Sequence, residues 1–66
     1  MRDFSVDIIG RMAVEAFYTP QSMTTTAVLM DVATGERYYF TYEYGTSQNL
    51  AIRRAKVDLA NQWSPQ

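Results

Sequence analysis

Residues 24–44 read TTTAVLMDVATGERYYFTYEY, and this stretch decides the fold. Its first part is rich in β-branched residues, and its last part carries aromatic side chains at every second position. Such alternation is typical of β-strands, because successive side chains point to opposite faces of a sheet. Gly35 lies between the two runs, where a tight hairpin requires a positive φ. The sequence therefore predicts two antiparallel strands, over Thr24–Val32 and Arg37–Tyr44.

The preceding segment, residues 4–18, also carries apolar side chains at most even positions, and the alternation continues past Gly10 without a slip. We interpret it as one long strand bent at Gly10, since a glycine inside a strand often marks a bulge or bend. Residues 11–17 contain good helix formers, so a helix is the alternative interpretation there. The polar stretch Thr19–Ser22, which contains Pro20, predicts a turn after this segment.

From Ser47 to Trp63 the apolar spacing becomes helical, because Ile52, Ala55 and Leu59 fall on one narrow arc. Ser47 is suited to cap the first turn of this helix, since its hydroxyl can accept a backbone amide. The sequence thus predicts one α+β domain over residues 1–66. Its architecture is β-β-β-α, a three-stranded antiparallel sheet with one C-terminal helix packed on one face.

The composition excludes several kinds of catalytic site. The 66-residue chain contains no cysteine and no histidine. A thiolate or histidine zinc site, a Cys-His or Ser-His nucleophile pair and a histidine general base are therefore excluded. The strand carboxylates are expected to face solvent, so no desolvated acid–base pair is predicted. We expect a protein that is not an enzyme and that uses no metal and no cofactor.

The charge and hydropathy patterns restrict the partners. The net charge is −1 and the pI is about 5.0, so no positive field attracts nucleic acid, and binding to it is disfavoured. No apolar run approaches the roughly 18 residues of a membrane span, and Asp3 and Asp7 interrupt the apolar pattern at the start of the chain. We expect neither a signal peptide nor a membrane helix, and a cytoplasmic location.

One helix covers only one face of a sheet, so the other face is expected to be open and to carry the odd-numbered strand residues. That set is more apolar than a solvated face requires, which indicates a binding or dimerisation surface; an antiparallel sheet with scattered apolar residues is the alternative. Tyr39 is the first choice for a contact, because tyrosine is enriched at interface hot spots. The candidate partner-binding residues are Tyr39, Leu29, Phe17, Thr41, Glu43 and Arg37.

The C-terminal helix offers a second candidate surface. Leu50 and Val57 form an apolar stripe on the side opposite Ile52 and Leu59. A basic group on the same helix, a candidate for polyanion binding, consists of Arg53, Arg54 and Lys56. The alternative is that both groups belong to an ordinary solvated helix surface.

The end of the chain resembles a double-stranded RNA-binding domain. The resemblance rests on Tyr44-Gly45-Thr46-Ser47, followed by Ala51, Ala55 and Lys56, and on the similar β-β-β-α order. In that family, lysines immediately after the serine and five residues after it contact phosphates. Here these positions hold Gln48, Asn49 and Ile52. The family also has an N-terminal helix, for which we expect no counterpart ahead of Phe4. The resemblance implies a degenerate nucleic-acid-binding domain as an alternative function.

Our leading hypothesis is a small protein that binds another protein through its open sheet face or a flank of its helix. In size, acidity and lack of catalytic residues, the chain resembles inhibitors and modulators encoded by bacteriophages, including anti-defence proteins. A third possibility is a homodimer whose sheet faces pack together.

Overall fold

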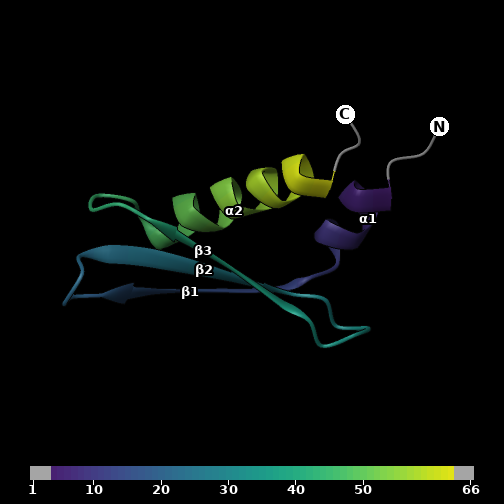
Figure 1. Cartoon of the computed structure of the whole chain (residues 1–66), viewed down its shortest axis with the longest axis horizontal. Coiled ribbons are helices and arrows are strands. Elements are labelled where there is room, and N and C mark those ends of the chain that lie inside the picture. The colour runs from purple at the N-terminus through teal and green to yellow at the C-terminus, as the bar shows by residue number, and fades with distance from the viewer. Residues whose placement is uncertain (1–3, 64–66) are drawn as a thin grey trace.

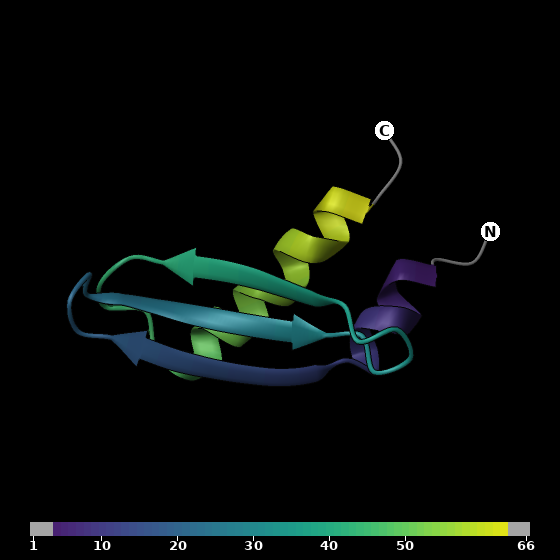
Figure 2. The same ribbon diagram turned by 60° about the horizontal axis from the view of Figure 1, so that its bottom comes forward.

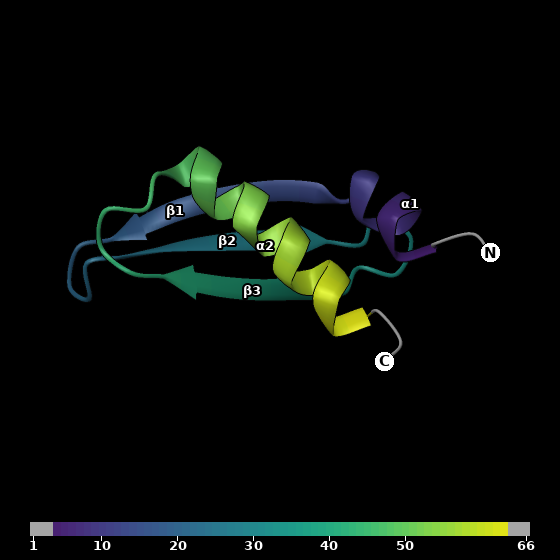
Figure 3. The same cartoon turned by 90° about the horizontal axis from the view of Figure 1, so that it is seen from above.

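A three-stranded antiparallel sheet with a helix lying across one face forms the protein (Figure 1). The computed structural model describes residues 4–63, with side chains from residue 7 onward, so the expected orientations of residues 4–6 lie outside the described part. The elements are, in order, α1 (Phe4–Gly10), β1 (Ala13–Thr19), β2 (Thr24–Met30), β3 (Arg37–Tyr42) and α2 (Gln48–Trp63). The strand order is β1-β2-β3, and α2 crosses the strands diagonally on one side (Figure 3). The predicted sheet and C-terminal helix are confirmed.

The first half of the predicted N-terminal strand is wrong, because it forms the helix α1. In the turn that follows, the amides of Arg11 and Met12 donate to the carbonyls of Ile8 and Ile9 at 3.1 and 3.2 Å. Ile9 and Met12 are buried. The apolar spacing in this segment fits a helix as well as a strand. Ile8 and Met12 are four residues apart, which places them on one face of a helix, and because four is an even number the same spacing also fits the alternation of a strand. Beyond this turn the chain is a strand from Ala13, as the favoured interpretation had it.

The hairpin between β2 and β3 turns at Gly35, as predicted. Its φ is 80°, and its amide donates to the carbonyl of Asp31 at 2.7 Å. The carboxylate of Asp31 accepts the amide of Ala33 at 2.9 Å, which stabilises the same turn. A left-handed conformation of this kind favours glycine, which has no Cβ to clash with the backbone.

The two connections of the sheet decide which side chains face α2. Thr19 pairs with Thr24, and Met30 pairs with Arg37, so each connection contains an even number of residues. When the connection between two antiparallel strands contains an even number of residues, odd-numbered residues of one strand lie opposite even-numbered residues of the other. Opposite residues point to the same face, and a shift of the pairing by one residue would move every side chain of a strand to the other face. Odd-numbered residues of β2 therefore share a face with even-numbered residues of β1 and β3. The predicted faces are correct for β1 and β3 and wrong for β2.

The core lies between α2 and the face of the sheet that it covers. Leu29 of β2 and Leu59 of α2 are its largest fully buried side chains. Ala51 and Ala55 are also fully buried, and their small side chains let the helix lie close to the strands. The remaining core members are Ile9, Met12, Ala27 and Tyr42. The predicted inward arc of the helix is confirmed.

The start of α2 is held by two side-chain hydrogen bonds. The hydroxyl of Ser47 accepts the amide of Leu50 at 3.1 Å, which confirms the predicted N-cap. The buried hydroxyl of Thr25, in β2, donates to the carbonyl of Thr46 at 2.9 Å. Between β3 and this cap, Gly45 adopts a φ of 94°. The turn into α2 is thus tied to the central strand.

Candidate docking surface on the open sheet face

The sheet face turned away from α2 is not covered by any of the elements described for residues 4–63; in Figure 2, α2 passes behind the strands and α1 lies at the end of the sheet. We call this surface the open face. By the strand register it carries Ala13, Glu15 and Phe17 from β1, Thr26, Val28 and Met30 from β2, and Arg37, Tyr39 and Thr41 from β3. The hydroxyls of Thr26 and Thr41 are hydrogen-bonded at 3.0 Å, as neighbours on one face.

A shallow depression with a volume of about 500 Å³ lies on the open face. Tyr39 is 61% exposed and Phe17 is 42% exposed, and both lie in the lining of this one depression. Val28 lies between Glu15 and Tyr39 in the register and adds an aliphatic side chain to the lining of the depression. The lining includes Glu15, Phe17, Val28, Met30, Arg37 and Tyr39. This combination of aromatic and aliphatic groups is suited to binding.

The open face carries one acidic and one basic side chain at opposite edges. Glu15 belongs to the edge strand β1, and Arg37 belongs to the other edge strand, β3. Both are exposed, and neither forms an ion pair with another residue between 4 and 63. The apolar centre is thus flanked by two charges of opposite sign, so one edge of the surface is acidic and the other is basic.

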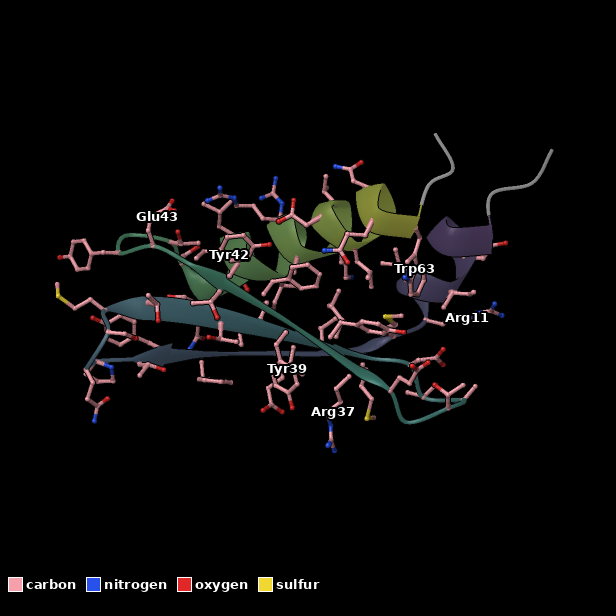
Figure 4. All side chains as sticks on the ribbon, in the orientation of Figure 1. Arg11, Arg37, Tyr39, Tyr42, Glu43 and Trp63 are labelled. Atoms are coloured by element: carbon pink, nitrogen blue, oxygen red, sulfur yellow. The ribbon has the colours of Figure 1, made fainter. Side chains whose placement is uncertain are left out.

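Four of the candidate residues expected on the open face lie there: Tyr39, Phe17, Thr41 and Arg37. Figure 4 shows Arg37 and Tyr39 on the side of the sheet away from α2, where both side chains point to solvent. The structure brings Tyr39, Arg37 and Phe17 together in the lining of one depression.

Two candidate residues are misplaced in the prediction. Leu29 is fully buried under α2, because the even-length connection before β2 reverses the faces of that strand. Glu43 follows the end of β3, and its carboxylate lies 3.5 Å from the guanidinium of Arg54, on the α2 side of the sheet (Figure 4). In place of Leu29, the open face carries Val28 and Met30. The even number of residues in the connection before β2 is the signal that would have placed Val28 and Met30 on the open face.

The three basic residues of α2 do not form one patch. At 100° per residue they are spread over about 160° of the helix circumference. Arg54 lies over the ring of Tyr42, 4.8 Å from its centroid, and also pairs with Glu43. Lys56 is half-buried and lines a small hollow with Ile9 of α1. Arg53 is exposed and forms no ion pair with another residue between 4 and 63, and it lines a hollow together with Arg54 and the exposed Leu50 and Val57.

The tyrosines on the covered face are held by α2. The hydroxyl of Tyr42 donates to the Asp58 carboxylate at 2.5 Å, and burial together with this bond raises the pKa of Tyr42 above its ordinary value, against the opposing effect of Arg54. The ring of Tyr38 meets that of Trp63 edge to face, with centroids 5.6 Å apart. Desolvation and the neighbouring Glu36 carboxylate raise the pKa of Tyr38. These contacts give both tyrosines a structural role.

The described part of the chain offers no group of three Asp, Glu, His or Cys side chains arranged to hold a metal ion. None of the helices found between residues 4 and 63 has the length and apolar character needed to span a membrane.

Comparison with known protein families, curated proteins and solved structures finds no match to this chain.

Proposed function

We propose that this chain is a non-enzymatic binding module that docks on another protein through its open face. The observation that carries the proposal is the exposure of Tyr39 and Phe17, at 61% and 42%, beside Val28 and Met30 on an uncovered sheet face. Aromatic anchors of this type supply much of the energy at protein interfaces, because they bury a large area at a small cost in side-chain entropy.

The charges on the open face favour a particular kind of partner. Glu15 and Arg37 flank the apolar centre on opposite edges. A partner that fits has an apolar patch with a basic group placed for Glu15 and an acidic group placed for Arg37. Complementary charges at the rim steer association and fix orientation more than they add affinity. We therefore expect the aromatic side chains to supply most of the binding free energy and the two charges to determine which partner binds.

Our proposal includes the role of an inhibitor or modulator of the kind that bacteriophages encode, for example against a host defence, acting in the cytoplasm. A length of 66 residues, a net charge of −1 and an exposed face with aromatic anchors are compatible with such a role. A binding module of this type acts by occupying a site on its target, so it needs no chemistry of its own.

A second candidate is a degenerate double-stranded RNA-binding domain. The observation that favours it is α1, because a helix ahead of the sheet gives the α-β-β-β-α order that the resemblance implies. Against it, the phosphate-contacting positions hold Gln48, Asn49 and Ile52. Arg54 is paired with Glu43, so of the two arginines of α2 only Arg53 has no ion-pair partner among residues 4–63. The protein-binding proposal therefore stands first.

Retention of proteins from nuclease-treated source cells tests the proposal. We compare the immobilised wild-type chain with a Tyr39→Asp variant and with a Val57→Asp control, which places the same charge on an equally exposed side chain of α2. We expect one protein to be retained by the wild type and by V57D, and to be lost with Y39D. Equal retention by Y39D and the wild type would contradict the assignment of the open face.

Direct titration with an RNA duplex tests the second candidate. A domain that contacts phosphates loses affinity steeply with salt, and each contact removed reduces the slope by about one unit. An Arg53→Ala variant is expected to lower the slope if α2 contacts RNA. Absence of binding at low salt would remove this candidate.

A further inference from the structure

On the side of the sheet that faces α2, the side chains of the edge strand β1 are more exposed than those of the edge strand β3. On the side of α2, Val14 and Tyr18 of β1 remain 41% and 46% exposed, whereas Tyr42 of β3 is buried against α2. On the open face, Phe17 is exposed as well. The strand β1 thus presents apolar side chains on both of its faces.

The backbone of β1 is also available for pairing. It pairs only with β2, so its outer amides and carbonyls have no strand beside them among the described elements. Proteins commonly protect such an edge with lysine, proline or a bulge. Glu15 is the single charged residue of β1, and the strand contains no lysine and no proline. An apolar edge of this kind is a template for another strand.

We propose that two copies of this chain pair through β1 in antiparallel orientation and form one continuous sheet of six strands. Pairing over the full strand, Ala13–Thr19, places the two-fold axis at Ala16. Pro20 follows immediately and has no amide proton, so it ends the pairing on that side. The strand itself therefore selects one register.

The side chains of β1 are self-complementary in this register. On the α2 side, Val14 lies opposite Tyr18 of the second copy, and the symmetry repeats this pair. Cross-strand pairs of an aromatic with a β-branched residue are favourable, and here each covers a side chain that the single chain leaves exposed. At the axis, the small Ala16 meets its own copy.

The charge pattern agrees with the same register. Glu15 lies opposite Phe17 of the second copy and not opposite the second Glu15. The two Glu15 residues become diagonal neighbours, with Cα atoms about 7–8 Å apart and both carboxylates in solvent. A register shifted to place the two-fold axis at Glu15 would set like charges directly opposite each other, which destabilises a strand pair.

This assembly uses an edge of the sheet, whereas the proposed docking uses the open face, so either inference can fail without the other. The two-fold axis is perpendicular to the sheet, and both open faces therefore lie on the same side of the dimer. A bivalent surface of this kind binds a partner with repeated sites more strongly than a single face does.

Sedimentation over a range of concentrations tests the dimer. We expect the wild type to be mainly dimeric at about 100 μM and to dissociate on dilution, as a small interface predicts. A Val14→Lys variant is expected to weaken association by at least about tenfold, because lysine pointing toward the protein blocks edge pairing. The matched Val57→Lys control, on α2, is expected to remain dimeric. A wild-type chain that stays monomeric up to about 1 mM would overturn the proposal.

Disulfide cross-linking tests the register, since the natural chain contains no cysteine. Antiparallel partners have Cα atoms about 4.5–5.5 Å apart, within the range of a disulfide. An Ala16→Cys variant is expected to form a covalent dimer under mild oxidation faster than an Ala33→Cys control in the exposed loop before β3. Equal rates for A16C and A33C, even with a dimer in solution, would show that another surface pairs.

A Glu15→Gln variant tests the charge pattern. Removing the diagonal repulsion is expected to tighten the dimer by about two- to threefold, the value for like charges at this separation in water. Weaker association of E15Q than of the wild type would contradict the proposed arrangement.

Discussion

Tyr38 and Tyr39 are neighbours in sequence, yet they lie on opposite faces of the sheet and have different roles. Tyr38 is partly buried and meets the ring of Trp63. Tyr39 is 61% exposed and makes no ring contact or hydrogen bond with any other residue between 4 and 63. The residue type is the same, so the face on which a side chain lies decides whether it contributes to stability or remains available for a partner.

The same contrast holds across the central strand. Leu29 is fully buried beneath α2, whereas Val28 lies on the open face. Substitutions on the covered face are expected to change stability, and substitutions on the open face are expected to change binding.

The largest effect is expected from Leu29→Ala. Removing a fully buried leucine side chain leaves a cavity and costs about 2–5 kcal/mol. The total stability of a 66-residue domain is only about 3–10 kcal/mol, so L29A should lower the melting temperature strongly or unfold the chain. Circular dichroism during denaturation measures this. The control is Val28→Ala, for which a loss below about 1.5 kcal/mol is expected. Equal losses would contradict the register.

The next effect concerns the close approach of α2 to the sheet. Ala55 is fully buried, and Ala55→Leu inserts a larger side chain between helix and strands, at a cost of about 1–3 kcal/mol. Asn61→Leu is the control, because Asn61 is exposed on the same helix, and a change within about 0.5 kcal/mol is expected. If A55L were as stable as N61L, the helix would not pack as closely as described.

The sequence predicted the strands of the hairpin and the C-terminal helix because their signals are local. Gly35 turns the hairpin with a positive φ, and Ser47 caps α2, and both roles depend on a few adjacent residues. Helix α1 was missed because an even-numbered helical step from Ile8 to Met12 has the same appearance as strand alternation. Seven residues of α1 are too short to be stable alone, so packing of Ile9 in the core decides their conformation.

The candidate site was predicted in its outer strands and not in its centre. Each even-length connection reverses the face of the next strand, and two reversals cancel, so Phe17 of β1 and Tyr39 of β3 were placed correctly. Only one connection precedes the central strand, so its faces are reversed relative to β1. The prediction therefore placed Leu29 on the open face, where the structure has Val28. Residues 27–30 are all apolar, so the alternation read from Val28 and Met30 does not by itself choose a face, whereas the length of the preceding connection does.

A smaller effect is expected from Tyr42→Phe, which removes the hydrogen bond to Asp58 at a cost of about 1 kcal/mol. The pKa of Tyr42 is raised in the folded chain above the value near 10 of an unfolded tyrosine. This contribution to stability is therefore fully present below about pH 10 and is lost as pH rises through the folded pKa. Denaturation at several alkaline pH values should show a steeper loss for the wild type than for Y42F. Parallel losses would mean that the bond does not contribute.

The smallest change in stability is expected from Tyr39→Ala, and it gives the sharpest test of the difference between the faces. Tyr39 makes no ring contact or hydrogen bond within residues 4–63, so its truncation should change the free energy of unfolding by no more than about 0.5 kcal/mol. Binding through the open face should nevertheless fall, because loss of an aromatic anchor at an interface costs about 2 kcal/mol or more. A loss of stability as large as that of Y42F would show that Tyr39 supports the fold. In that case the open face would lose its principal anchor, and the contrast with Tyr38 would no longer separate structural from binding residues.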